Sequence, residues 1–83
     1  MTDSSKSALS LISTHKGYSE SEQRIVDYIL ENQSEAPRLT AAQLSRAAAT
    51  SEATVSRFCR KLGFGSFRSF QFSLARDLES QRN

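Results

Sequence analysis

The side chains best suited to chemistry lie between Ser51 and Leu62. At about 100° per residue, the apolar residues of this segment fall within about 100° of one helix circumference: Val55, Phe58, Cys59 and Leu62. The opposite side of this predicted helix carries small, hydroxyl-bearing and cationic residues: Ala53, Arg57 and Arg60, flanked by Thr54, Ser56 and Lys61. Such a face presents hydrogen-bond donors and positive charge together, which suits the binding of a polyanion.

Two short helices and the break between them must hold this face in place. Thr40 and Gln43 form a capping box that begins the first helix. A break of about three residues follows, and its last residue, Ser51, can cap the second helix. Residues 40–62 therefore have the spacing of a helix-turn-helix, whose second helix (about 52–62) is expected to lie in the major groove of duplex DNA.

Base recognition is expected from the first half of this second helix. The guanidinium of Arg57 can make a bidentate contact to guanine, worth about 1–3 kcal/mol of discrimination. Ala53 and the methyl group of Thr54 can touch a thymine methyl group, and Glu52 can accept a hydrogen bond from cytosine. Ser56 can reach either a base or a phosphate.

Phosphate contacts are expected from Ser51, Arg60 and Lys61. Ser51 lies at the helix N-terminus, where exposed backbone amides suit an anion. Arg60 and Lys61 lie farther along the helix and can neutralise the DNA backbone. The alternative for each of these residues is a solvated helix face, because paired amphipathic helices also occur in proteins that never bind DNA.

The charge distribution also favours a polyanionic partner. Residues 1–37 contain three Lys or Arg against six Asp or Glu, a net charge of −3. Residues 38–83 contain eight against three, a net charge of +5. A basic half in a chain whose overall net charge is +2 indicates nucleic acid. A solvated surface or a contact for an acidic protein has the same charge pattern.

Helical periodicity throughout the 83 residues predicts one all-α domain, a compact five-helix bundle containing the helix-turn-helix. Ser19 and Glu22 form a second capping box, and Gly63 can end the helix over 52–62. Phe72 lies about 200° from Phe70 and is expected to be partly buried, with a partner interface as the alternative. The expected core also takes in these residues: Ala8, Leu9, Leu11, Ile12, Ile25, Val26, Ile29, Leu30, Ala41, Leu44, Ala48, Phe67, Leu74 and Leu78.

Catalytic, metal and cofactor sites are not expected. The chain has one cysteine and one histidine, too few for a structural zinc site, and no glycine-rich phosphate loop. Cys59 lies on the apolar stripe and is expected in the core, while His15 is expected at the surface. Neither a signal peptide nor an apolar run of about 18–20 residues is present. We therefore expect a cytoplasmic protein that does not contact a membrane.

Several motifs resemble the RpiR family of bacterial transcriptional regulators. The strongest is S-E-A-T-V-S-R-F-C-R-K-L-G-F at 51–64, preceded by T-A-A-Q-L-S-R-A-A at 40–48. F-R-S-F-Q-F-S-L-A-R-D-L at 67–78 and Y-S-E-S-E-Q-R-I-V-D-Y-I-L-E-N at 18–32 resemble further helices of the family. The resemblance implies a five-helix DNA-binding domain. It places these residues where members of the family are expected to meet DNA: Ser51, Ala53, Thr54, Ser56, Arg57 and Lys61.

The same resemblance implies how the chain is organised. We expect a flexible N-terminus over 1–5, the DNA-binding domain over 6–80 and the start of a linker over 81–83. In the family, such a domain normally precedes a sugar-isomerase-type (SIS) domain, which is expected to be absent from this chain. The full-length protein is then expected to be a homodimer on a palindromic operator, and to respond to a phosphosugar through the missing domain.

Two residues depart from the usual helix-turn-helix pattern. Ala49 stands where glycine is common, and it is expected either to adopt φ > 0 at a cost of about 1 kcal/mol or to take part in a modified turn. Thr50 stands where a hydrophobic residue is common. The alternative function is a small helical protein–protein interaction module whose basic face is solvated. Steeply salt-dependent binding to DNA would separate the two functions.

Overall fold

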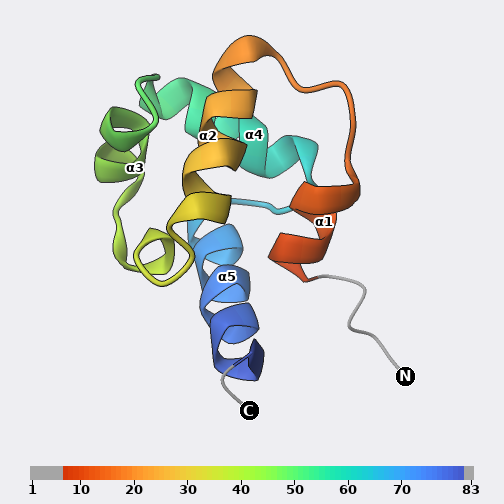
Figure 1. The fold of residues 1–83 in the computed structure, drawn as a ribbon. Coiled ribbons are helices and arrows are strands. Elements are labelled where there is room, and N and C mark those ends of the chain that lie inside the picture. Colours follow the sequence, from red (N-terminus) through yellow and green to blue (C-terminus); the bar gives the residue numbers. More distant parts are fainter. Residues whose placement is uncertain (1–6, 82–83) are drawn as a thin grey trace.

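Helices follow one another along the whole computed structural model, which describes residues 7–81 (Figure 1). They are α1 (Ala8–Thr14), α2 (Glu20–Glu31), the 3₁₀ helix η2 (Ala36–Arg38), α3 (Ala41–Ala47), α4 (Glu52–Lys61) and α5 (Phe67–Gln81). No strand occurs among the described residues, and the predicted all-α fold with five α-helices is confirmed. The flexible segment predicted for 1–5, and residues 82–83 of the predicted linker, lie outside the described residues.

Side-chain caps begin two helices where the sequence predicts them. At α2, the Glu22 amide donates to Ser19 Oγ (3.2 Å) and the Ser19 amide donates to Glu22 Oε1 (2.9 Å). At α3, the Gln43 amide donates to Thr40 Oγ1 (3.1 Å) and the Thr40 amide donates to Gln43 Oε1 (2.9 Å). Each capping box gives hydrogen-bond acceptors to two backbone amides within the first turn. The local sequence therefore specifies where these two helices begin.

In the turn between α3 and α4, Ala49 adopts the left-handed conformation, the first of the two alternatives expected for it. Ala49 has φ 58°, and its amide donates to the carbonyl of Arg46 (3.1 Å). The next amide, of Thr50, donates to the carbonyl of Ser45 (2.8 Å). These bonds close α3 and direct the chain into the first turn of α4. An L-residue in this conformation carries a steric cost that glycine avoids.

Replacing this alanine by glycine should stabilise the protein. Ala49→Gly removes a left-handed strain of roughly 1–2 kcal/mol and adds about 0.5–1 kcal/mol of unfolded-state entropy, a net gain of about 0.5–1 kcal/mol. Urea unfolding followed by circular dichroism measures the difference. The matched control is Ala47→Gly, in the last turn of α3, which should destabilise because its backbone is helical. Equal losses for both variants would show that the turn is unstrained.

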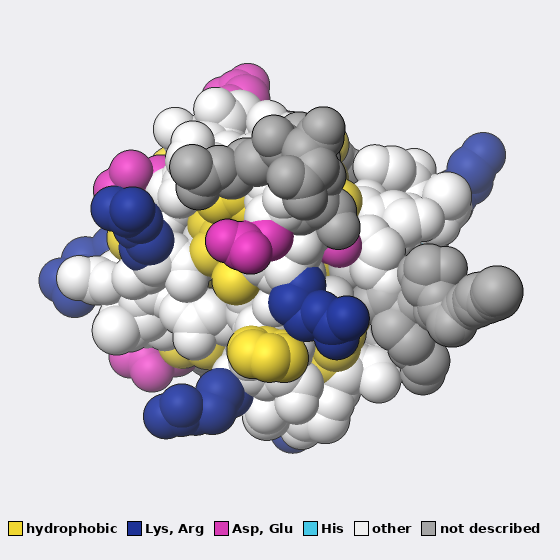
Figure 2. Space-filling view, turned by 90° about the horizontal axis from the view of Figure 1, so that it is seen from below, with side chains coloured by type: hydrophobic (Ala, Val, Ile, Leu, Met, Phe, Trp, Pro, Cys, Tyr) yellow, Lys and Arg dark blue, Asp and Glu magenta, His cyan; other side chains and the backbone are white. Residues whose placement is uncertain are grey.

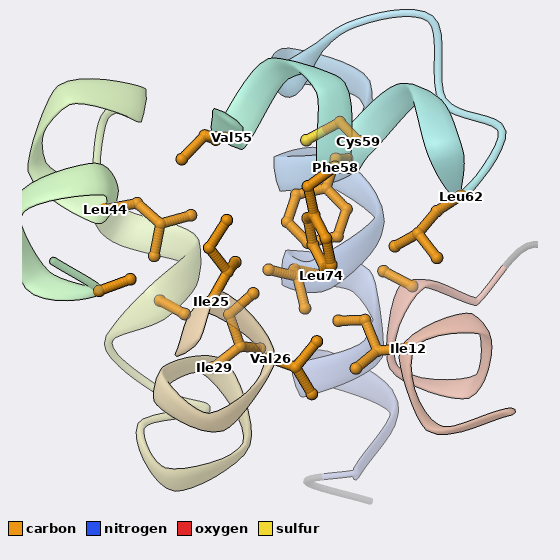
Figure 3. Packing of buried hydrophobic residues seen from close by; sticks show 14 residues of the cluster. Ile12, Ile25, Val26, Ile29, Leu44, Val55, Phe58, Cys59, Leu62 and Leu74 are labelled. Carbon is orange, nitrogen blue, oxygen red and sulfur yellow. The ribbon is translucent and has the colours of Figure 1, made fainter. Parts of the chain in front are cut away.

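All five α-helices contribute side chains to one apolar core (Figure 3). Phe58 of α4 lies within it, fully buried, with its ring 5.7 Å from that of Phe70 at an interplanar angle of 84°. The ring of Tyr18 lies 5.8 Å away from Phe58 on another side. The edge-to-face contact between Phe58 and Phe70 adds to the energy of burial. The aromatic contacts therefore hold α4 against α5 and the segment before α2.

Two residues predicted for the core are exposed. Leu30 is 39 % exposed, whereas Val26, one turn earlier on the same side of α2, is 4 % exposed. Ile29, in the last turn of α2, is 0 % exposed, so the apolar stripe is covered along the helix except at its edge, where Leu30 lies. Phe72 is 66 % exposed, so the prediction of partial burial is wrong. Its position about 200° around α5 from the buried Phe70 turns it away from the core.

A short 3₁₀ helix, which the sequence analysis did not predict, connects α2 to α3. The side-chain amide of Gln71 on α5 donates to the carbonyls of Pro37 (3.0 Å) and Leu39 (2.8 Å). Pro37 has no backbone amide to donate, and it lies at the start of η2, where none is required. Gln71 therefore fixes the approach of the chain to α3 against α5.

Candidate nucleic-acid interface

The buried side of α4 determines which of its side chains face outward. Val55, Phe58 and Cys59 are each 0 % exposed, and Leu62 is 8 % exposed. The apolar stripe predicted from the helix wheel is therefore confirmed. Burial raises the pKa of the Cys59 thiol to about 12, although the charge of Arg60 acts in the opposite direction. Cys59 is a core residue, as predicted, and its thiol stays protonated at neutral pH.

The predicted site residues lie together on α4 and at its N-cap. Most of them are exposed: Ser51, Glu52, Ala53, Ser56, Arg57, Arg60 and Lys61. Thr54 is half-buried, and its hydroxyl lies 3.0 Å from that of Ser51. The Thr54 amide donates to Ser51 Oγ (3.2 Å), which begins α4 as predicted. Their contact with DNA stays a prediction.

Arg57 reaches outward from the middle of this face. One of its Nη atoms donates to Thr54 Oγ1 (3.4 Å), one turn toward the N-terminus. This long hydrogen bond leaves most donors of the planar guanidinium fork able to bind a ligand. Small and hydroxyl-bearing side chains lie near the start of α4, and cations lie farther along it. A helix that enters the major groove has this arrangement when its first turns contact base edges.

Lys61 differs from the other predicted site residues because its ammonium already has a partner. Lys61 Nζ lies 2.6 Å from Glu22 Oε1, and only 34 % of the lysine side chain is exposed. The two residues are 39 positions apart, so no local pattern predicts the pair. The sequence predicted a phosphate contact for Lys61 and a helix cap alone for Glu22. In the structure, this ion pair connects α4 to α2.

Glu22 is one of the two buried polar residues among those described, at 8 % exposure. Burial raises the pKa of its carboxyl group, but hydrogen bonds from Lys61 and Ser19 and the charge of Lys61 outweigh it. The net result is a pKa below the ordinary value of glutamate. A carboxylate that holds its charge in the folded state stabilises that state above its unfolded pKa.

This shift gives Glu22 a measurable part in acid unfolding. Its contribution to stability is fully present above the unfolded pKa of about 4.3 and is lost as the pH falls through the lower folded value. Glu22→Gln should therefore flatten the fall in stability below about pH 4.5. Urea midpoints measured from pH 7 to pH 3 test this. Glu31→Gln, which removes an exposed carboxylate from the same helix, is the matched control, and identical pH profiles for the two variants would contradict the assignment.

Arg24 is a second residue of α2 that sequence reasoning missed. One of its Nη atoms donates to the carbonyl of Ala49 (3.3 Å) and to Ser21 Oγ (3.4 Å). Arg24 is exposed and lies beside the turn that precedes α4. It belongs to the acidic half of the sequence, and no motif connects it with the basic half. Only the tertiary fold brings its positive charge to the helix-turn-helix.

The surface at which α5 ends has a mixed character (Figure 2). Hydrophobic side chains gather near the centre of this view, with cationic and anionic side chains around them. A shallow groove along α5 and η2 is lined in part by Pro37, Arg68, Gln71 and Phe72. Charges of both signs present no continuous basic field. This side of the molecule therefore suits a nucleic acid less well than α4 does.

The described residues offer little for other chemistry. Among residues 7–81, no group of three or more His, Cys, Asp or Glu side chains could hold a metal ion. Within the same residues, no helix combines the length and the apolar character needed to cross a bilayer. His15 follows α1 as its C-cap, half-buried, with its ring 5.0 Å from that of Tyr18.

Comparison with known proteins agrees with this geometry. Residues 6–81 match the model of the helix-turn-helix domain of the rpiR family. The chain is 41 % identical over 59 residues to the HTH-type transcriptional regulator HexR of Pseudomonas aeruginosa, covering 71 % of this chain and 21 % of that protein. It is 38 % identical over 64 residues to the uncharacterized HTH-type transcriptional regulator TTE0211 of Caldanaerobacter subterraneus, covering 77 % and 23 %.

A further relative is the uncharacterized HTH-type transcriptional regulator YfhH of Escherichia coli, 31 % identical over 67 residues, which are 81 % of this chain and 24 % of that protein. The chain thus spans less than a quarter of the length of these relatives. No solved structure matches it. The matched domain, the HTH-type relatives and the exposed face of α4 lead to one conclusion. The chain belongs to the rpiR family of helix-turn-helix domains, the non-enzymatic DNA-binding domains of transcriptional regulators.

Proposed function

We propose that this chain binds duplex DNA sequence-specifically, with α4 in the major groove. The observation that carries the proposal is the division of α4 into a fully buried apolar side and an exposed side with small, hydroxyl-bearing and cationic residues. The major groove, about 12 Å wide, admits an α-helix of about 10–12 Å diameter. The exposed side of α4 is therefore the part of the helix able to reach base edges.

Base recognition rests chiefly on Arg57. Its guanidinium can donate two parallel hydrogen bonds to O6 and N7 of guanine. Ala53 and Thr54 lie near the helix start, where a small side chain or a methyl group can approach a thymine methyl. Glu52 can accept from the amino group of cytosine, and Ser56 can bind a base or a phosphate.

Phosphate binding rests on the two ends of α4. Ser51 caps the helix N-terminus, where the helix dipole and first-turn amides favour an anion. Arg60 lies exposed in the last turn and can neutralise a phosphate on the groove edge. These contacts fix the register of the helix on the duplex and carry no sequence information themselves.

We further propose that the chain acts within a longer cytoplasmic regulator. The relatives are more than four times as long as the segment they share with this chain, which leaves room for a domain that binds a phosphosugar and forms a homodimer. Two copies of α4 about 34 Å apart then contact successive major-groove faces of a palindromic operator.

Fluorescence anisotropy with a mixed-sequence duplex at about 50 and 200 mM salt tests the DNA-binding proposal. If the domain neutralises about four phosphates, affinity should fall roughly 100-fold between the two conditions. Selection from a random-sequence duplex library then tests sequence specificity. Binding at neither salt concentration, by the chain alone or by a fused tandem dimer, would favour the protein-interaction module with a solvated basic face.

A further inference from the structure

Helix α2 crosses α4 and makes polar side-chain contacts with the C-terminal end of α4 and with the turn that precedes its N-terminus. Figure 1 shows α2 lying across α4, with the turn from α3 on one side and the end of α4 on the other. Glu22 and Arg24 are two positions apart, so they project about 200° apart around α2. One therefore reaches the C-terminal end of α4 and the other reaches the turn before its N-terminus.

The contact at the C-terminal end is anchored within α2 itself. Glu22 Oε1 accepts from Lys61 Nζ at 2.6 Å and from the Ser19 amide at 2.9 Å. The same oxygen thus completes the capping box of α2 and holds the last residue of α4. Because Glu22 is 8 % exposed, water screens this pair less than it screens a surface ion pair. The carboxylate cannot follow a displaced lysine without losing the helix cap.

The contact at the N-terminal end holds the turn rather than the helix. Arg24 donates to the carbonyl of Ala49 at 3.3 Å, and Ala49 has the left-handed φ of 58°. Two residues later, Ser51 caps α4. The orientation of the Ala49 peptide therefore determines where the cap and the first turn of α4 lie. Arg24 constrains that peptide from outside the helix-turn-helix.

We infer that Glu22 and Arg24 are positioning residues, through which α2 sets the angle at which the recognition helix α4 enters the DNA groove. The inference rests on the proposed function of α4. Burial of Val55 and Phe58 is non-directional, whereas hydrogen bonds depend on both distance and angle. Polar contacts at the last residue of a helix about 15 Å long and at the turn before its first residue define its tilt. Lys61 is the anchor of α4 in this arrangement, and not a phosphate contact.

The inference predicts a separation between affinity for any DNA and discrimination between sequences. A positioning residue touches no phosphate, so its replacement should leave the salt dependence of binding unchanged. A direct phosphate contact, by contrast, lowers the magnitude of the log–log salt slope by about one when removed. Misalignment of α4 should lower the ratio of affinities for the correct and the wrong sequence about tenfold. This factor lies within the range of discrimination that one bidentate base contact supplies.

The test uses the duplex that the unaltered chain selects from a random-sequence library, compared with a scrambled duplex of the same composition. Glu22→Gln retains an acceptor for the Ser19 amide, and Lys61→Met retains the apolar stem. Each should lower the affinity ratio for the two duplexes about tenfold, and the double variant should be no worse than either one. Arg24→Gln should have a similar effect. Glu31→Gln and Arg38→Gln, which remove exposed charges elsewhere, should leave the ratio unchanged.

Two results would overturn the positioning role. One is an unchanged ratio in all three variants. The other is a flatter salt slope for Lys61→Met or Arg24→Gln, which would make that residue a phosphate contact. If the unaltered chain itself selects no sequence, the proposed function fails, and the positioning role fails with it.

Backbone residual dipolar couplings provide a readout that needs no DNA. In Glu22→Gln and Arg24→Gln, the amides of α4 should no longer fit the orientation found in the unaltered chain, whereas those of α5 should still fit it. Circular dichroism and urea midpoints establish that each variant is folded. Unchanged couplings across α4 would overturn the inference whatever the binding data show.

Discussion

Phe58→Ala should lower the free energy of unfolding by about 3–5 kcal/mol, the usual cost of truncating a buried aromatic residue. Phe58 is fully buried and contacts the rings of both Tyr18 and Phe70. A domain of this size has a total stability of roughly 4–12 kcal/mol at the usual 0.05–0.15 kcal/mol per residue. The variant should therefore lose a large part of the domain's stability.

Urea unfolding monitored by far-ultraviolet circular dichroism measures this loss. Phe72→Ala is the matched control, because it makes the same truncation on a ring that is 66 % exposed. We expect the control to change stability by less than about 0.5 kcal/mol. If both variants lowered the free energy of unfolding by similar amounts, the Phe72 side chain would have to be buried in solution and not exposed on α5.

Arg57→Ala should weaken binding to the selected duplex by about 5- to 150-fold, which corresponds to 1–3 kcal/mol for a bidentate base contact. Arg57 is exposed on α4 and donates only one long hydrogen bond, to Thr54. Its removal leaves the core of α4 untouched. Binding to a scrambled duplex should fall much less, because non-specific affinity rests on phosphate contacts.

The control for this prediction is Arg76→Ala, which removes an exposed guanidinium from α5 and lies outside the helix-turn-helix. Anisotropy titrations of both variants against both duplexes separate the effect of losing a positive charge from the effect of losing a base-specific contact. If Arg57→Ala and Arg76→Ala weaken the two duplexes equally, Arg57 contributes only charge. The assignment of the base-reading face of α4 would then be wrong.

The features that depend on neighbours in the chain were predictable. The capping boxes at Ser19 and Thr40 need only residues three positions apart, and both form as predicted. The left-handed Ala49 and the left-handed Gly63 that follows the C-cap of α4, with φ 99°, agree with the turn pattern. Burial on α4 follows from helical periodicity, since one side of the helix must face the core.

The features that depend on the packing of distant helices were not predictable. Glu22 meets Lys61, and Arg24 meets the carbonyl of Ala49, only because α2 crosses the helix-turn-helix. The error at Phe72 has a related cause. A helix wheel shows that Phe72 and Phe70 point in different directions, but it cannot show whether another helix covers the second direction. Within residues 7–81 no helix covers it, and Phe72 is exposed.

Because Cys59 is buried, the rate at which its thiol is alkylated reports how often the folded protein opens. Cys59 is the chain's one cysteine, it is 0 % exposed, and its thiol pKa is raised to about 12 by burial. The thiolate attacks an alkylating reagent, so labelling proceeds through molecules in which α4 has left the core. When reclosing is fast, the labelling rate measures the population of that open form. A ligand that binds only the folded form lengthens the labelling half-life by the factor 1 + [L]/Kd. The labelling rate of Cys59 can thus measure the affinity of the protein for such a ligand without an attached dye.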